Sequence, residues 1–207
     1  MRPATAYLPR IGLLAACLLA LAIAPSLAPS PARSQTTIKR DDVIEQLSRF
    51  DAAPEINVAA LRQQVAERAK TRSRNEPPAQ KRPPIAPDLL ALPTFSVDIQ
   101  FDTDTPIVRP ESYQALGRIA DALVHARLLP YGFLIVGHIE ANGKRESNAL
   151  LSQRRADAIR DVLVNTFKIS AKRLQSLGLG EEQLLDAAHP TAPVNQQIQI
   201  LTIAKAP

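Results

Sequence analysis

The chain of 207 residues is 45% hydrophobic and 22% charged, a mixture that excludes wholesale disorder and a polytopic membrane protein. Its net charge of +5 is unevenly distributed, since residues 1–34 carry three basic and no acidic side chains and residues 35–92 carry ten basic and eight acidic ones. Residues 93–207 hold twelve of each sign. A nucleic-acid-binding domain is expected to be basic itself, so nucleic acid is excluded as the partner of this neutral half.

Residues 1–34 have the layout of a signal peptide. Arg2 and Arg10 precede an apolar run over residues 11–24, which as a helix spans about 21 Å and falls short of a ~30 Å hydrocarbon core. We predict cleavage before Gln35, which leaves no cysteine and excludes disulfides. The alternative is a lipoprotein, because Cys17 ends a lipidation motif. Membrane association is expected only if the signal is uncleaved or Cys17 is lipidated.

Residues 35–74 are predicted to form a helical segment. Asp42 and Glu45 fit a capping box at the start of a first helix, and Asn57 fits the N-cap of a second. The basic end of this second helix is interpreted as a solvated helix end rather than a site for an anionic surface. The proline-rich residues 75–93 are predicted to form a semi-rigid, extended linker.

Residues 94–207 are predicted to form one α/β domain. Alternating apolar residues over 95–101 indicate a half-buried strand, and the continuous apolar run over 133–136 indicates a strand covered on both faces. A helix is expected between Pro110 and Pro130, and a longer one over residues 147–167. Short elements and a last strand complete the predicted order; the strand covers residues 198–203.

The long helix places an arginine among its buried positions. Its inward stripe, marked by Ile159 and Leu163, extends towards the N-terminus through Ser152 and Arg155. A buried guanidinium needs an anionic partner, and the candidate is Glu140 in the preceding loop. The two residues form either a structural ion pair or a divided site, in which the acid receives a ligand ammonium and the arginine a carboxylate.

Two motifs resemble those of the OmpA C-terminal-like domain. Residues 137–143 read Gly-His-Ile-Glu-Ala-Asn-Gly, and Asn148 is followed by Leu-Ser-Gln-Arg-Arg-Ala over residues 151–156. The family pattern is Gly-His-Thr-Asp-x-x-Gly, then Asn-x-x-Leu-Ser-x-x-Arg-Ala, and the resemblance covers roughly residues 95–204. It implies an α/β (α+β) fold with a mixed β-sheet and helices on one side. It also implies non-catalytic binding of peptidoglycan in the Gram-negative periplasm, within the outer-membrane-associated cell envelope.

The resemblance also implies a ligand, the diaminopimelate of the stem peptide. The residues that match the motif are Glu140 and Arg155, with Asn148, Gly143 and Asp104 as neighbours. The alternative is an envelope protein-interaction scaffold with a degenerate pocket, in which the helices of residues 41–74 recruit a partner protein.

Three departures from the family pattern bear on this choice. Ile139 stands where the family has threonine, and Glu140 replaces aspartate and moves the charge by about one bond length (~1.5 Å). Gln196 and Gln197 stand where many members have arginines, and glutamine does not replace arginine in gripping a carboxylate. These changes are expected to weaken or retune the pocket.

The sequence predicts no enzyme, cofactor or metal centre. His138 and Glu140 share a strand face and could begin a metal site, but no third ligand is spaced nearby. We therefore interpret His138 as a hydrogen-bonded histidine at a strand end. No phosphate-binding loop and no Ser-His-Asp arrangement is found.

Overall fold

The computed structural model describes residues 38–50, 55–71 and 77–205. The signal peptide, its cleavage site and the lipidation of Cys17 lie outside these residues and stay predictions. Within the described ranges, no helix has both the length and the apolar character needed to cross a membrane.

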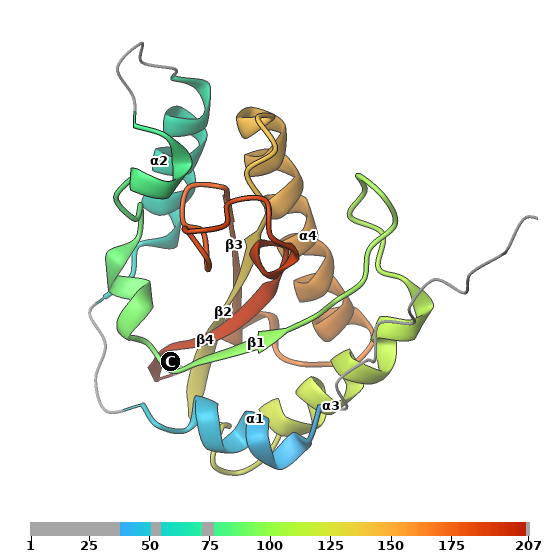
Figure 1. Cartoon of the computed structure of the whole chain (residues 1–207). Helices are drawn as coiled ribbons and strands as arrows, with labels where there is room; N and C mark the ends of the chain where they lie inside the picture. Colours follow the sequence, from blue (N-terminus) through green and yellow to red (C-terminus); the bar gives the residue numbers. More distant parts are fainter. Residues whose placement is uncertain (1–37, 51–54, 72–76, 206–207) are drawn as a thin grey trace, which may run out of the picture. The chain divides into compact units, whose positions relative to one another are not determined.

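Four strands form a mixed sheet in the order β1-β4-β2-β3. Strands β2 (Tyr131–His138) and β3 (Leu174–Gly180) are parallel, whereas β4 (Ile198–Lys205) is antiparallel to β2 and to the edge strand β1 (Thr94–Val97). Figure 1 shows the strands at the centre of the fold with helices around them. The mixed sheet confirms the predicted fold class.

One face of the sheet packs against three helices. Helices α3 (Tyr113–Leu123) and α4 (Arg145–Asn165) contribute to a core that includes Phe133 and Ile135 of β2. Helix α1 (Arg40–Leu47) joins the same core beside α3 (Figure 1). The inward stripe of α4 is as predicted, because Ser152, Arg155 and Ile159 are all buried.

The opposite face is covered by helix α2 of the predicted helical segment and by residues predicted to form an extended linker. Helix α2 (Val58–Lys70) contacts β3 and α4, and the 3-10 turns η1 (Ala79–Lys81) and η2 (Pro87–Ala91) follow it. A second core joins these elements to the sheet; its residues include Val65, Ile85, Leu89, Leu92, Leu134, Val136, Leu177 and Leu201.

The expectation of an extended spacer is therefore wrong for residues 77–93. The apolar residues between the prolines explain the difference, since burying one such side chain stabilises a fold by about 1.5–3 kcal/mol. Leu134 and Val136 of β2 would otherwise face water. The strand over residues 133–136 is covered on both faces, as predicted, but the second cover comes from this segment.

Several element boundaries differ from those expected. Helix α1 begins at Arg40 with Lys39 as N-cap, so Asp42 lies inside the helix and does not cap it. Asn57 caps α2 as predicted, and its side chain accepts a hydrogen bond of 3.0 Å from the Ala60 amide. The first strand ends at Val97, and β3 is a full strand rather than a short element.

The outward edge of β3 is capped by side chains. The Leu174 carbonyl accepts a hydrogen bond from Arg160 (3.0 Å), and the Ser176 carbonyl accepts one from Arg62 Nε of α2 (3.0 Å). The amide of Gly178 donates to Gln153 of α4 (2.8 Å). The backbone groups of these alternate residues point away from β2. The side chains of Arg160, Arg62 and Gln153 therefore make the hydrogen bonds that a further strand would make.

Helix α4 lies very close to β2 and β3. A Cβ atom added to Gly178 would lie 2.1 Å from the Gln153 backbone nitrogen, and one added to Gly137 would lie 2.4 Å from the Ser152 carbonyl oxygen. The two glycines let the helix backbone rest on the sheet. This contact fixes the distance between α4 and the sheet. The predicted site residues Asn148 and Arg155 both lie on α4.

Candidate functional site

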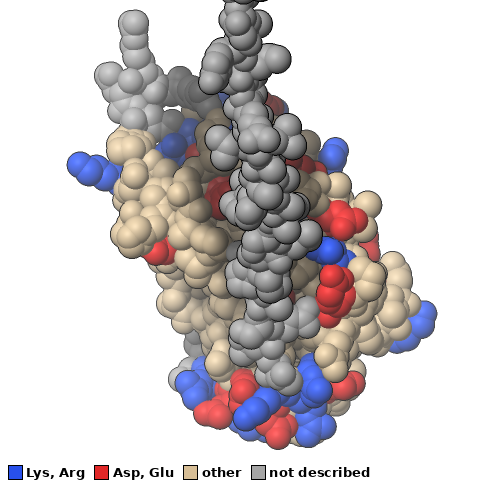
Figure 2. Space-filling model, turned by 45° about the vertical axis from the view of Figure 1, so that its right-hand side comes forward, with Lys and Arg blue, Asp and Glu red and all other residues tan. Residues whose placement is uncertain are grey.

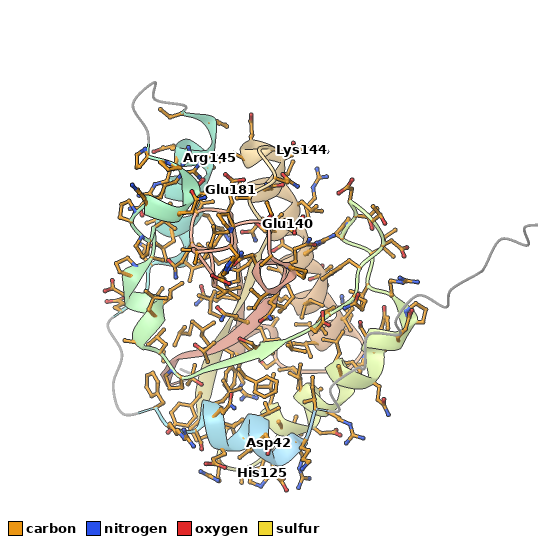
Figure 3. The ribbon with its side chains drawn as sticks, viewed as in Figure 1. Asp42, His125, Glu140, Lys144, Arg145 and Glu181 are labelled. Carbon is orange, nitrogen blue, oxygen red and sulfur yellow. The ribbon has the colours of Figure 1, made fainter. Side chains whose placement is uncertain are left out.

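The loop between β2 and α4 carries the predicted acidic residue. Figure 3 shows Glu140 near Glu181 and Lys144, at the end of the molecule opposite Asp42 and His125. Gly143 in this loop has φ +84°, a left-handed conformation that favours glycine. The sequence motif thus places a glycine where the turn into α4 requires one.

Asn148 fixes the position of this loop. The residue is 3% exposed, and its Nδ2 donates to the Glu140 carbonyl (3.2 Å), to Asn142 Oδ1 (2.9 Å) and to Glu181 Oε2 (2.9 Å). Two amide hydrogens are shared among these acceptors. The structure brings together the predicted residues Glu140, Gly143 and Asn148, and commits the Asn148 amide nitrogen to holding the loop.

The Glu140 carboxylate, in contrast to the Asn148 amide, can bind a ligand. The residue is half-buried, and within the described part of the chain its carboxylate has no hydrogen bond or ion pair. A carboxylate in such a position accepts a cation at little further desolvation cost. Glu140 is thus available to an ammonium group.

Arg155 is held at a second point along α4. The residue is 9% exposed; its Nε donates to the Thr105 carbonyl (3.0 Å), and its guanidinium carbon lies 4.7 Å from the ring centroid of Phe101. Burial lowers the pKa of Arg155, and the negative charge of Asp104 opposes that shift. The guanidinium remains charged, because arginine is not deprotonated in proteins.

The remaining nitrogens of Arg155 are not fully enclosed. Every buried side-chain nitrogen and oxygen in the described residues has a hydrogen-bond partner, so those of Arg155 without one are accessible. Asp104 lies in the turn that presents the Thr105 carbonyl, and its φ of 54° is left-handed. The structure thus brings Asp104 next to Arg155, as the sequence analysis expected.

One of the two alternatives for Arg155 and Glu140 is wrong. Within the described residues, Arg155 and Glu140 form no ion pair, and the guanidinium is supported by Thr105 and Phe101 instead. A structural ion pair with Glu140 therefore does not explain the burial of Arg155. Thr105 was missed because a backbone carbonyl acceptor has no sequence signal, whereas the alternating strand pattern did place Phe101 on the buried face.

The acidic and basic groups lie along one side of α4. Asn148 and Arg155 are seven residues apart, which corresponds to about two turns and ~10.5 Å along the same helix face. Asn148 holds the Glu140 loop at one end of this interval, and Arg155 lies at the other. Such an arrangement offers an anion acceptor and a cation acceptor to one zwitterionic or dipolar ligand.

The structure shows where the residues that depart from the family pattern lie. Ile139 is buried, and its amide donates to the Gly180 carbonyl (3.0 Å). Its side chain therefore belongs to the interior rather than to the open part of the loop. Gln196 is exposed and Gln197 half-buried, beside the buried Asn195, which holds the loop over residues 186–190.

His138 is a hydrogen-bonded interior residue, as predicted. Its Nδ1 donates to the Gln183 carbonyl (3.0 Å), and its Nε2 lies 3.0 Å from the side-chain amide of Gln199. Burial lowers the pKa of His138, and these two hydrogen bonds oppose the shift. In the described part of the chain, no three histidine, cysteine, aspartate or glutamate side chains gather as metal ligands do.

The lowered pKa of His138 predicts a pH-dependent stability. Because the native pKa lies below the ordinary value of about 6.5, the unfolded chain binds the proton first as the pH falls. The stabilisation that comes from burying a neutral His138 is fully present above pH ~6.5. Below this pH the free energy of unfolding falls, by at most about 1.4 kcal/mol per pH unit. Urea unfolding at pH 7.5 and 5.5 measures this loss.

We expect His138→Gln to show a smaller loss of stability between the two pH values than the wild type. His125→Gln, at a half-exposed histidine on the other side of the fold, is the control and should retain the full loss. An equal loss in His138→Gln and in the wild type would contradict the assignment.

Buried charges surround the end of β3. Glu182 is fully buried and accepts two hydrogen bonds from the buried Arg145, one of them at 2.7 Å from Nη2. Glu181 is 3% exposed and pairs with Arg82 at 3.1 Å. Arg68 of α2 lies 4.0 Å from Glu182. Two of these three arginines come from the segment that covers the second sheet face.

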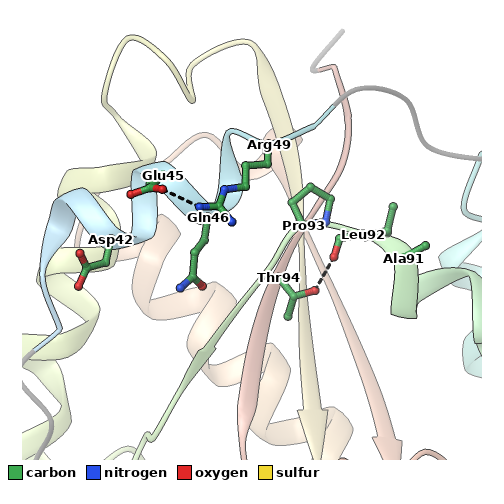
Figure 4. A pocket seen from close by; sticks show the side chains of 8 residues that line it. All are labelled: Asp42, Glu45, Gln46, Arg49, Ala91, Leu92, Pro93 and Thr94. Atoms are coloured by element: carbon green, nitrogen blue, oxygen red, sulfur yellow. Dashed lines mark hydrogen bonds and ion pairs between the residues drawn. The ribbon is translucent and has the colours of Figure 1, made fainter.

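A surface pocket lies elsewhere on the molecule, away from these buried charges. It has a volume of about 460 Å³ and is lined by Asp42, Glu45 and Gln46 of α1, by Arg49 just after that helix, and by residues 91–94 (Figure 4). Glu45 and Arg49 pair with each other at 2.6 Å. Acidic and basic side chains are also interspersed on the face drawn in Figure 2. Neither this pocket nor the charged surface groups the described side chains as a catalytic site does.

Comparison with known proteins identifies similar domains. Residues 100–197 match the model of the OmpA family. Outer membrane porin F of Pseudomonas aeruginosa is 28% identical over 122 residues, which are 58% of this chain and 34% of that protein. The peptidoglycan-associated lipoprotein of Rhizobium meliloti is 38% identical over 85 residues, which are 41% of this chain and 47% of that protein.

Among solved structures, the cell wall anchor of the T6SS from Pseudomonas aeruginosa is 29% identical with a TM-score of 0.42. The match covers 54% of this chain and 80% of that one. The chain spans between a third and a half of the length of the curated relatives described above.

Proposed function

We propose that this chain binds peptidoglycan without catalysis and tethers itself to the cell wall, because residues 100–197 match the model of the OmpA family. One relative is by name a peptidoglycan-associated lipoprotein, which supports the proposal. The relatives named above also support a place in the periplasm, associated with the outer membrane.

The proposed ligand is the diaminopimelate of the stem peptide. The observation that carries the proposal is the pair of groups along α4: a Glu140 carboxylate without a hydrogen bond or ion pair among the described residues, and an Arg155 guanidinium whose remaining nitrogens are not fully enclosed. Glu140 would receive the ligand ammonium and Arg155 its carboxylate, by charge-assisted hydrogen bonds. Asn148 and Gly143 would hold the loop, and Asp104 would stand beside the arginine.

Co-sedimentation of the full chain with purified peptidoglycan tests the proposal. We expect Arg155→Ala to weaken binding by about tenfold or more, the effect of losing charge-assisted hydrogen bonds of roughly 1.5–3 kcal/mol. Arg154→Ala is the matched control, because Arg154 is the exposed neighbour on the same helix and removes the same charge. Glu140→Gln should weaken binding as well.

Each outcome has a distinct meaning. Failure of the wild type to sediment with peptidoglycan would contradict the proposal and favour the protein-interaction scaffold. Binding that free diaminopimelate does not compete away would show that the wall is bound through another group. Equal losses in Arg154→Ala and Arg155→Ala would mean that the helix contributes only its net charge.

A further inference from the structure

A side chain of the proline-rich segment is connected to the ligand loop by hydrogen bonds. Arg82 is 15% exposed and its Nη1 lies 3.1 Å from Glu181 Oε1. The other oxygen of the same carboxylate accepts from Asn148 Nδ2 at 2.9 Å. That nitrogen also donates to the Glu140 carbonyl and to Asn142 Oδ1. Glu140 is thus joined to Arg82 through two intermediate side chains.

The buried Glu181 carboxylate is paired in this arrangement. Burying a carboxylate to 3% exposure costs free energy unless a cation or hydrogen-bond donors accompany it. Arg82 supplies the cation, and the ionised carboxylate then makes a stronger hydrogen bond with Asn148 than a neutral acceptor would. Without Arg82, the acceptor that holds one side of the Asn148 amide is weakened.

The loop responds to the position of that amide. Asn142 Oδ1 accepts from Asn148 and also from the Lys144 amide at 3.1 Å, while the Asn142 amide donates to the Glu140 carbonyl at 3.0 Å. A displaced Asn148 therefore releases two contacts of the loop together. Glu140 would lose the fixed backbone from which its carboxylate projects.

We propose that Arg82 is a positioning residue for the ligand site. The proline-rich segment covers the second sheet face and also, through Glu181 and Asn148, sets the position of Glu140 for the cationic end of the ligand. This inference rests on the proposed function for its effect on binding. Its structural part, the ordering of the loop over residues 139–144, stands independently of any ligand.

The test compares Arg82→Ala with Lys81→Ala in the full chain. Lys81 is the exposed neighbour, so both variants remove one positive charge from the same turn. We expect Arg82→Ala to weaken binding of free diaminopimelate by about tenfold, the cost of one charge-assisted hydrogen bond, and Lys81→Ala to leave it unchanged. Arg82→Lys should restore most of the affinity, since one nitrogen makes the contact.

A double-mutant cycle separates positioning from general loss of structure. Glu181→Gln alone should weaken binding as Arg82→Ala does, and the double variant should bind no more weakly than either single one. Circular dichroism at the binding temperature verifies that each variant is folded. Additive losses, or wild-type affinity in Arg82→Ala, would overturn the inference.

Hydrogen exchange supplies a readout without ligand. The amides of Asn142 and Lys144 should exchange faster in Arg82→Ala than in the wild type and in Lys81→Ala. If the wild type binds no free diaminopimelate, the proposed ligand is wrong, and this measurement still decides the role of Arg82. Unchanged exchange of these two amides in Arg82→Ala would overturn the inference.

Discussion

Replacing Glu182 by glutamine is expected to lower the free energy of unfolding by about 3–5 kcal/mol, the usual cost of breaking a buried ion pair. Glu182 is fully buried and accepts two hydrogen bonds from Arg145, whose side chain is 3% exposed. The glutamine keeps the shape of the side chain and removes its charge. Arg145 would then keep a positive charge in the interior opposite a neutral acceptor.

Chemical denaturation of the full chain measures this effect. Glu146→Gln is the matched control, because it makes the same change at an exposed position in the first turn of α4 and should cost less than about 1 kcal/mol. The Arg145→Met, Glu182→Leu double variant should be less destabilised than Glu182→Gln, since it leaves no unpaired charge between these partners. Similar stabilities for Glu182→Gln and Glu146→Gln would contradict the energetic importance of the pair.

Replacing Gly178 by alanine is expected to destabilise the protein by about 3 kcal/mol or more, at the upper end of the cost of overpacking a core. The added methyl group would lie 2.1 Å from the backbone nitrogen of Gln153 and 2.4 Å from its Cα atom. These are backbone atoms of α4, so no flexible side chain can move to relieve the contact. The helix would have to withdraw from the sheet.

Gly117→Ala provides a control of opposite sign. Gly117 lies inside α3, and an added Cβ would meet the Phe167 ring at an ordinary distance of 3.5 Å. Alanine should stabilise the helix there by up to about 1 kcal/mol. Thermal unfolding of both variants measures the difference, and a Gly178→Ala protein as stable as the wild type would contradict the close approach of α4.

Local periodicity explains why much of the fold could be predicted. The buried stripe of α4 repeats every three to four residues, so Ser152 and Arg155 could be assigned to the interior from the sequence alone. The motif residues around Glu140 and Asn148 follow one another closely in the chain. Their contacts depend on a single strand-to-helix turn, and the structure brings them together.

Long-range contacts explain what the sequence could not indicate. Arg82 and Glu181 are 99 residues apart, and the prolines around Arg82 favour an extended chain over a packed one. The adjacent acids Glu181 and Glu182 after Gly180 were the available signal, because a buried acidic pair requires cations from elsewhere. Strand β3 was missed since its glycines and Ser176 are poor strand formers.

The side chains along β3 have a consequence for how copies of the chain meet. An exposed strand edge is a template for pairing with another molecule, and Arg160, Arg62 and Gln153 occupy the groups that such a strand would use. The opposite edge, β1, is only four residues long, and very short edges are poor templates. Copies of the chain at high concentration would therefore resist joining their sheets, the first step towards aggregation.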